Sequence, residues 1–246
     1  MKNNVYHFLT NIKYETAALA LIDPDIKNDD KLIDIVDKVN FANFDAILVG
    51  GSILSDDKYL NRIKKIKQLT SKPLILFPGS SSQINNDVDA VLYLSLISGR
   101  NPKYLIEEHV NSALSIYNSN IETIPVGYIL IDGSTLSDVQ IESKTLPISA
   151  NETEMIVSHA LASQYLGHKF IFLEAGSGAA KHIEGCLVEN IKKYLDIPII
   201  VGGGIVNLEI VKNIKKGYPD FMVIGNFLEQ DNNKEEIKKM VNLIHE

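Results

Sequence analysis

The stretch Ile199-Ile200-Val201-Gly202-Gly203-Gly204 joins a short β-branched apolar run to three consecutive glycines. Apolar runs without polar alternation are typical of parallel strands that are buried on both faces. Similar runs recur along the whole chain, at residues 17–22, 46–49, 74–77, 90–94, 126–131, 170–173, 199–201 and 221–224. A polar segment follows each run, so the sequence predicts eight parallel strands joined by right-handed crossovers.

Amphipathic segments fill most of the gaps between these runs and predict seven helices. They cover residues 29–40, 58–69, 102–117, 152–165, 183–194, 208–216 and 234–245. The exception is residues 78–89, which are rich in Pro, Gly, Ser and Asn and too short for a helix with its turns. We therefore predict that the outer helix after the third strand is missing.

The number of strands and the chain length favour a (β/α)₈ TIM barrel, in which 250 residues are typical. An open doubly wound sheet is the alternative, but such sheets usually have fewer strands. The dinucleotide fingerprint is also absent, because the glycines that follow Val201 lack the third member of G-x-G-x-x-G. We expect residues 1–246 to form one domain, a barrel that lacks its third outer helix.

Composition narrows the class of protein further. Of the 246 residues, 45% are hydrophobic and 22% charged, and the formal net charge of −7 argues against non-specific nucleic-acid binding. The single cysteine, Cys186, excludes an internal disulfide framework and suits the cytoplasm; we expect it in the core. No apolar run reaches the length of a membrane span, and residues 1–15 lack the pattern of a secretory signal.

Active sites of such barrels lie where the strands end, and glycines gather there after the last strands. Gly203 and Gly204 follow the seventh run, Gly225 and Asn226 end the eighth, and residues 174–178 follow the sixth. Exposed backbone N–H groups of such loops can surround a phosphate, and a Cβ would block its approach. The alternative is that these glycines only form tight turns.

Two carboxylates at strand ends are candidates for chemistry. Asp23 follows the first run, and with Ser52 it could supply one or two ligands to Mg²⁺, leaving the others to a diphosphate. The alternative for Asp23 is a cap or turn residue, although Asp25 fits a cap better. Glu174 follows the sixth run and could take a proton from a substrate hydroxyl; alternatively it binds loop N–H groups.

The residues at the strand ends, taken in order, resemble the geranylgeranylglyceryl phosphate synthase family, which includes the bacterial heptaprenylglyceryl phosphate synthases. The matching segments are residues 21–25, 49–52, 76–80, 94–102, 172–178, 201–205 and 224–226. Phe-Pro-Gly-Ser at 77–80, Ser-Gly-Arg-Asn-Pro at 98–102 and Leu-Glu-Ala-Gly-Ser-Gly at 173–178 are specific to it in combination. The resemblance implies a barrel without the third helix, which agrees with the gap at 78–89.

The resemblance also implies an activity and a site. A Mg²⁺-dependent prenyltransferase of this family joins the C3 hydroxyl of sn-glycerol 1-phosphate to C1 of geranylgeranyl diphosphate, forming an ether and releasing diphosphate. Asp23 and Ser52 would bind the Mg²⁺ that carries the prenyl diphosphate, and Glu174 would be the catalytic base. The glycerol phosphate would be bound by Phe172, Leu173, Glu174, Ala175, Gly176, Ser177, Gly178, Gly203, Gly204, Gly225 and Asn226.

Three further expectations accompany the resemblance. Some branches of the family carry lysine two residues before the first aspartate, where this chain has Leu21, so no basic phosphate contact is expected from that strand. The hydrocarbon should lie in an apolar groove with sides formed by residues 80–89 and 93–104. Relatives form dimers or hexamers, so we expect self-association, although the sequence alone does not identify the contact.

Two other classes of function fit the same phosphate loops. One is a phosphosugar isomerase in which Glu174 acts as a carbon base, without Mg²⁺ or a prenyl substrate. An aldolase of the Schiff-base type is disfavoured because none of the eight runs contains a lysine. The other is a non-catalytic phosphate-binding barrel, which would bind its ligand without turnover.

Overall fold

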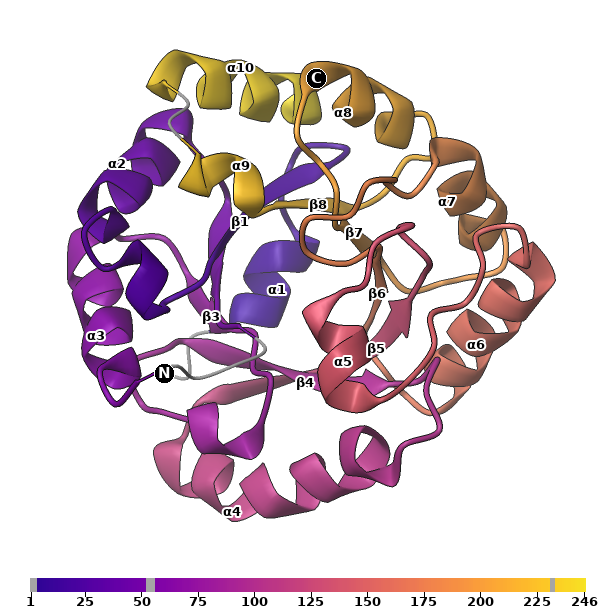
Figure 1. Ribbon diagram of the computed structural model, residues 1–246, viewed down its shortest axis with the longest axis horizontal. Coiled ribbons are helices and arrows are strands. Elements are labelled where there is room, and N and C mark those ends of the chain that lie inside the picture. Colours follow the sequence, from indigo (N-terminus) through magenta and orange to yellow (C-terminus); the bar gives the residue numbers. More distant parts are fainter. Residues whose placement is uncertain (1–3, 52–55, 231–232) are drawn as a thin grey trace.

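Eight parallel strands close into a barrel that helices surround (Figure 1). The computed structural model describes residues 4–51, 56–230 and 233–246. The strands are β1 (Ala17–Ile22), β2 (Ala46–Val49), β3 (Leu74–Leu76), β4 (Ala90–Leu96), β5 (Glu122–Leu130), β6 (Phe170–Glu174), β7 (Ile199–Gly202) and β8 (Phe221–Ile224). The closure comes from β1, which pairs in parallel with both β2 and β8. The predicted TIM barrel is confirmed.

The α-helices of the described residues form the outer ring and three additions to it. The ring consists of α2 (Leu32–Ala42), α3 (Tyr59–Leu69), α4 (Glu108–Ser119), α6 (Thr153–Tyr165), α7 (Gly185–Lys192), α8 (Leu208–Lys215) and α10 (Lys234–His245). The additions are α1 (Val5–Thr10), α5 (Asp138–Ser143) and α9 (Asn226–Glu229). Three short helical segments are η1 (Ile26–Asn28), η2 (Ser81–Gln83) and the π-helical η3 (Lys103–Glu107).

The third outer helix is missing, as predicted. Between β3 and β4 the described chain contains only the single turn η2. Because no long helix covers this part of the barrel wall, the outward-facing Val91 and Tyr93 of β4 face a cavity, described below. The absence of the helix thus opens one side of the barrel.

Two apolar layers hold the barrel together. The inner layer contains inward-facing residues such as Leu19, Leu48 and Phe170, whereas the outer layer joins alternate strand residues to the helices. Side chains that alternate between these layers explain why each strand appears in the sequence as a continuous apolar run.

Helix α1 closes the N-terminal end of the barrel, an element that the sequence analysis did not predict. Its Val5 and Leu9 are buried and join the inner layer beside Ala17 (Figure 1). The Glu122 carboxylate, at the start of β5, accepts hydrogen bonds from the backbone N–H groups of Val5, at 2.5 Å, and Tyr6, at 3.2 Å. One acidic side chain therefore anchors the beginning of the helix to the barrel.

We expect Glu122→Ala to lower the free energy of unfolding by about 1–2 kcal/mol, since it removes the acceptor of two N–H groups at a helix N-terminus. Urea unfolding followed by circular dichroism measures this change. Glu15→Ala, at an exposed position just before β1, is the control and should have little effect. Equal effects of the two substitutions would show that the anchor does not stabilise the fold.

The structure corrects several predicted details. The strand predicted at 126–131 begins at Glu122, because Ala90 of β4 pairs with Glu122 and extends the ladder through polar residues. The helix predicted at 102–117 consists of η3 followed by α4. Cys186 is exposed and not in the core, because α7 turns its neighbours Leu187 and Val188 inward instead.

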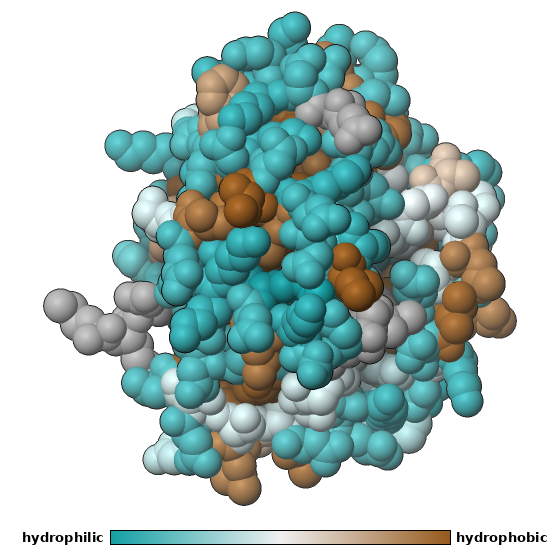
Figure 2. Space-filling model, turned by 60° about the vertical axis from the view of Figure 1, so that its left-hand side comes forward, coloured by the Kyte–Doolittle hydropathy of each residue, from teal (hydrophilic) through white to brown (hydrophobic). Residues whose placement is uncertain are grey.

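Figure 2 shows the flank that carries α2 and α3, which is mostly hydrophilic with separate hydrophobic patches. In the described part of the chain, no helix combines the length and the apolar character that crossing a bilayer requires.

Candidate active site

A cavity of about 230 Å³ opens at the C-terminal ends of the strands, where the sequence analysis placed the site. Polar loops after β1, β2, β6, β7 and β8 form its mouth, and the segment after β3 lines one side together with β4, η3 and α4. Among the described residues that line it, six carry a carboxyl group and one carries an ammonium group. They are Asp23, Glu108, Asp138, Glu142, Glu174 and Glu229, with Lys27 as the single cation.

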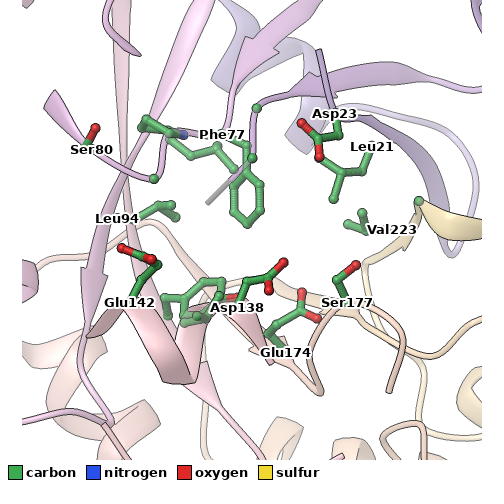
Figure 3. A pocket seen from close by; sticks show the side chains of 18 of the residues that line it. Leu21, Asp23, Phe77, Ser80, Leu94, Asp138, Glu142, Glu174, Ser177 and Val223 are labelled. Atoms are coloured by element: carbon green, nitrogen blue, oxygen red, sulfur yellow. The ribbon is translucent and has the colours of Figure 1, made fainter. Parts of the chain in front are cut away.

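Glu174, at the end of β6, lies buried at the mouth with its carboxylate facing the cavity (Figure 3). It is 7% exposed, and its Oε1 accepts a hydrogen bond from the Gly176 N–H at 2.7 Å. Burial raises the pKa of Glu174 to about 7, although the Gly176 N–H partly opposes this shift. A carboxylate with this pKa can accept a proton near neutral pH.

The structure shows why glycine is required at position 203, directly after β7. A Cβ on Gly203 would lie 2.5 Å from Oε1 of Glu174 and 2.8 Å from the backbone nitrogens of Ala175 and Gly176. Gly203 also has φ +86°, a left-handed conformation that favours glycine. The glycine therefore makes room for the Glu174 carboxylate, in addition to the phosphate role predicted for this loop.

The loops after β6 and β8 meet across the mouth. The Ser177 hydroxyl donates to Asn226 Oδ1 at 2.9 Å, and a Cβ on Gly178 would lie 3.7 Å from Asn226 Nδ2. Ser177, Gly178, Gly203, Gly204, Gly225 and Asn226 all line the cavity. The structure thus brings these predicted phosphate-loop residues together at one side of the mouth.

Other residues of the predicted glycerol phosphate set have different surroundings. The side chains of Leu173 and Ala175 pack in the outer apolar layer, between strands and helices. Phe172 is fully buried inside the barrel, beneath the mouth. The described residues that line the cavity do not include Phe172, Leu173, Ala175 or Gly176. We therefore expect side-chain contacts to a ligand from the adjacent residues of this segment that do line it.

Asp23 follows β1, which pairs with β8, and it lies across the cavity from Glu174 and Ser177 (Figure 3). Its Oδ2 is 3.0 Å from Lys27 Nζ, and Lys27 is also 3.7 Å from Oε2 of Glu229. Burial raises the pKa of Asp23, and the hydrogen bond and positive charge of Lys27 only partly offset that effect. Burial likewise opposes the charge on Lys27, but Asp23 and Glu229 outweigh it, and the pKa of Lys27 is raised.

The two aspartates of the Asp23-Pro24-Asp25 segment have different roles: one caps a helix and the other lines the cavity. The Asp25 side chain caps η1 by accepting from the Lys27 N–H at 3.1 Å, as predicted. The Asp23 side chain lines the cavity instead, and its Oδ1 would lie 2.6 Å from a Cβ on Gly51. Glycine at position 51 thus leaves space for an oxygen ligand. Ser52, the other predicted metal ligand, lies outside the described residues.

The Asp23 side of the mouth fits Mg²⁺ only together with a substrate. In the described part of the chain, no group of three or more His, Cys, Asp or Glu side chains could hold a metal. Mg²⁺ is commonly bound through one or two carboxylates, several waters and substrate phosphate oxygens. One cavity-facing carboxylate beside an open glycine loop is compatible with that arrangement.

The cavity continues as a groove along the side of the barrel that lacks a helix. Its apolar lining includes Ile84, Leu94 and Tyr104, from the two segments expected to form the sides of a hydrocarbon groove, and also Val91, which lies between those segments. The Ser81 N–H donates to Glu108 Oε2 at 2.6 Å and links η2 to α4 across this region.

Sequence reasoning missed several residues that the fold brings to the cavity. Lys27 places a positive charge at the cavity, although position 21, where some branches of the family carry lysine, is leucine here. Lys27 lies five residues after β1 and belongs to no recognisable motif. Phe77 and Tyr128 occupy ends of apolar strands, where aromatic residues are ordinarily core. Asp138 belongs to α5, a short helix that the sequence analysis did not predict.

Fold and site together define a (β/α)₈ barrel with glycine loops and a buried carboxylate at its mouth. Residues 10–244 match the PcrB family, and the chain belongs to that family. The resemblance seen in the rim motifs is confirmed.

The relatives are similar over nearly the whole chain. A geranylgeranylglyceryl phosphate synthase of Chitinophaga pinensis is 37% identical over 100% of this chain and 97% of its own length. A protein of the same name from Methanosphaera stadtmanae is 36% identical over 98% of this chain and 100% of its own. A crystal structure of (S)-3-O-geranylgeranylglyceryl phosphate synthase from Thermoplasma acidophilum, in complex with substrate sn-glycerol-1-phosphate, has a TM-score of 0.90 and 31% identity. It covers 100% of this chain and 99% of that one.

Proposed function

We propose that this protein is a prenyltransferase that joins the C3 hydroxyl of sn-glycerol 1-phosphate to C1 of geranylgeranyl diphosphate. The product is an ether, and diphosphate is released. Membership of the PcrB family and the names of its relatives support this reaction. The structural observation that carries it is the buried Glu174, with a pKa of about 7, in the same mouth as the glycine loops and Asp23.

Glu174 is the general base of the proposed reaction. Its Oε1 is held by the Gly176 N–H, so the carboxylate has a fixed direction toward the cavity. When the C3 hydroxyl oxygen attacks C1, its proton passes to this carboxylate. The raised pKa makes Glu174 a stronger base than an exposed glutamate and still leaves a large fraction ionised near pH 7.

The glycine loops bind the phosphate of sn-glycerol 1-phosphate in this proposal. Ser177 and Gly178 approach Asn226 from the opposite loop, which places backbone and hydroxyl groups of two loops around one space. Glu174 lies in the same segment as Ser177. Binding the phosphate here would therefore hold the hydroxyl close to its base and reduce the entropic cost of the reaction.

Asp23, with Ser52, would hold a Mg²⁺ ion on the other side of the mouth. When bound, the ion would supply charge stabilisation to the leaving diphosphate. Lys27, 3.0 Å from Asp23, offers the diphosphate a second positive group from the protein itself. The isoprenoid chain would extend from this side into the groove lined by Leu94 and Tyr104, where water is excluded from it.

The purified protein should be incubated with Mg²⁺, labelled sn-glycerol 1-phosphate and prenyl diphosphates of several lengths. We expect a lipid-extractable ether that forms only when all three are present, and the assay also identifies the preferred chain length. A metal-independent isomerisation of phosphosugars would favour the isomerase, while phosphate binding without any turnover would favour the non-catalytic barrel. Either result would contradict the proposed function.

We also propose that two copies associate through one face of η3 and α4. Four apolar side chains share this face, with exposures of 56–81%: Ile106, Val110, Leu114 and Tyr117. Residues 109–121 contain no Asp, Glu, Lys or Arg. Contact faces are depleted in charge at their centres, and an uncharged face lets two acidic chains approach.

Light scattering after gel filtration tests this contact. We expect the wild-type chain to have at least twice the mass of a single copy, and Val110→Glu combined with Leu114→Glu to have the mass of one copy. Leu60→Glu, at a 49% exposed apolar position on α3, is the matched control and should behave as wild type. A wild-type chain that is monomeric at all concentrations, or a double variant that still associates, would exclude this interface.

The cytoplasmic location expected from the lone cysteine stays a prediction.

A further inference from the structure

Phe77 is the one aromatic side chain that Figure 3 shows projecting into the middle of the cavity among its labelled residues. Leu21 and Asp23 lie on one side of its ring, Leu94 lies on the other, and Glu174 is on the opposite wall (Figure 3). Phe77 directly follows β3, and its N–H donates to the Val49 carbonyl at 2.9 Å, which fixes its backbone to β2. It is half-buried, unlike the strand residues before it.

The Phe77 ring is held in one orientation by two other rings. Its centroid is 5.3 Å from that of Phe172, with an angle of 17° between the planes, and 6.1 Å from that of Tyr128. Phe172 is fully buried and Tyr128 is 5% exposed. Phe172 therefore stacks against one face of Phe77.

The charges around Phe77 favour a positive reaction centre. Six carboxylates and one ammonium line the cavity within the described residues, and Glu174 and Asp23 lie on opposite sides of the ring. An aromatic face attracts a cation through its quadrupole, and the attraction is greatest where water is excluded. The negative surroundings and the ring thus act in the same direction.

We infer that the ring of Phe77 contacts the allylic C1–C3 unit of the prenyl diphosphate and stabilises the positive charge that develops there during transfer. The inference rests on the proposed function. In the step, the C1–O bond to diphosphate breaks and both electrons leave with the diphosphate. A lone pair of the C3 hydroxyl oxygen forms the new C1–O bond, and the hydroxyl proton passes to Glu174. Phe77 forms no bond; it lowers the energy of the cation-like transition state.

The position of C1 follows from the two groups that must act on it. The leaving oxygen is held on the Asp23 side and the attacking oxygen on the Glu174 side, so C1 has to lie between them. Phe77 projects into that space (Figure 3). A side chain of similar size without a π-system would fill the space and contact the hydrocarbon, but it would not attract the developing charge.

The decisive experiment changes the electrons of the ring without changing its size. Phe77 is replaced by mono-, di- and trifluorophenylalanine, which weakens the quadrupole stepwise, and the rate constant of a single turnover is measured by rapid quench. We expect the logarithm of the rate constant to fall with each fluorine, by about 30-fold in total, which corresponds to about 2 kcal/mol. The KM values of both substrates should change little. The same series at Phe44, a buried core position away from the cavity, is the matched control.

Substitutions of Phe77 by ordinary amino acids provide a second test. We expect Phe77→Leu to lower the single-turnover rate constant by a similar factor, and Phe77→Tyr to restore most of it. A rate constant that is independent of fluorination in an active enzyme would overturn the inference, as would losses confined to the KM of the prenyl diphosphate. If the wild-type chain forms no ether at all, the proposed function fails first, so the two failures are distinguishable.

Discussion

Glu174→Gln is expected to lower the turnover of ether formation by about 10³-fold, because glutamine cannot accept the hydroxyl proton. Its amide oxygen can still accept the hydrogen bond that the Gly176 N–H donates at 2.7 Å, so the loop should keep its shape. The affinity for sn-glycerol 1-phosphate, measured by calorimetry, should therefore change little. In the wild type, turnover should rise with pH through about 7 as Glu174 loses its proton.

The same substitution should stabilise the fold at alkaline pH. The pKa of Glu174 is raised to about 7 in the folded chain, from a usual value of 4.5. Its protonated form therefore favours the folded state at low pH, and this advantage is lost as the pH rises through 7. Between about pH 4.5 and pH 8 the loss is about 3 kcal/mol in the wild type and absent in Glu174→Gln. The free energy of unfolding of Glu174→Gln, relative to that of the wild type, should therefore increase over that pH range.

These two results distinguish a catalytic base from a structural carboxylate. A purely structural Glu174 would leave turnover nearly unchanged in Glu174→Gln. Equal stability of the two proteins at pH 5 and pH 8 would contradict the raised pKa that the base depends on. Loss of glycerol phosphate affinity would show that the substitution disturbed the loop, and Glu174→Asp would then be needed to separate geometry from charge.

Asp23→Asn is expected to lower kcat/KM for the prenyl diphosphate by about 100-fold or more, since an amide is a poor Mg²⁺ ligand. The concentration of Mg²⁺ that supports half-maximal rate should increase strongly. Binding of sn-glycerol 1-phosphate should be unaffected, because Asp23 lies across the cavity from Ser177 and Glu174 (Figure 3).

The control for this variant is Asp25→Asn, two residues away. Asp25 caps η1 by accepting from the Lys27 N–H, and asparagine is an equally good cap, so this variant should keep its Mg²⁺ dependence. An unchanged Mg²⁺ dependence in Asp23→Asn would exclude the aspartate from the metal site. Loss of glycerol phosphate binding in that variant would show that the two sides of the mouth are not independent.

Most of the fold could be predicted because its strands are buried on both faces. The run at 17–22 was predicted with the bounds that β1 has, and those at 46–49 and 221–224 likewise match β2 and β8. The missing outer helix was visible as a segment too short and too rich in Pro, Gly and Ser. Short elements were not predictable: α1, α5 and α9 have four to six residues, too few for a helical period to emerge.

The candidate site could be predicted only where glycine or acid follows a strand directly. Glu174 is such a residue, but its raised pKa comes from burial, which no local pattern encodes. Lys27 and Phe77 were missed for a related reason. Their roles depend on which strand ends meet across the mouth, and that proximity comes from closure of the barrel.

A structure of the protein bound to sn-glycerol 1-phosphate and an unreactive thiodiphosphate analogue of the prenyl substrate tests the central claim most directly. We expect the glycerol phosphate to lie against Ser177, Gly204 and Asn226, with its C3 hydroxyl within hydrogen-bonding distance of Glu174. We expect the diphosphate of the analogue beside Asp23 and its hydrocarbon chain in the groove past Leu94. Binding of either compound at the N-terminal end of the barrel, or a C3 hydroxyl remote from Glu174, would contradict it.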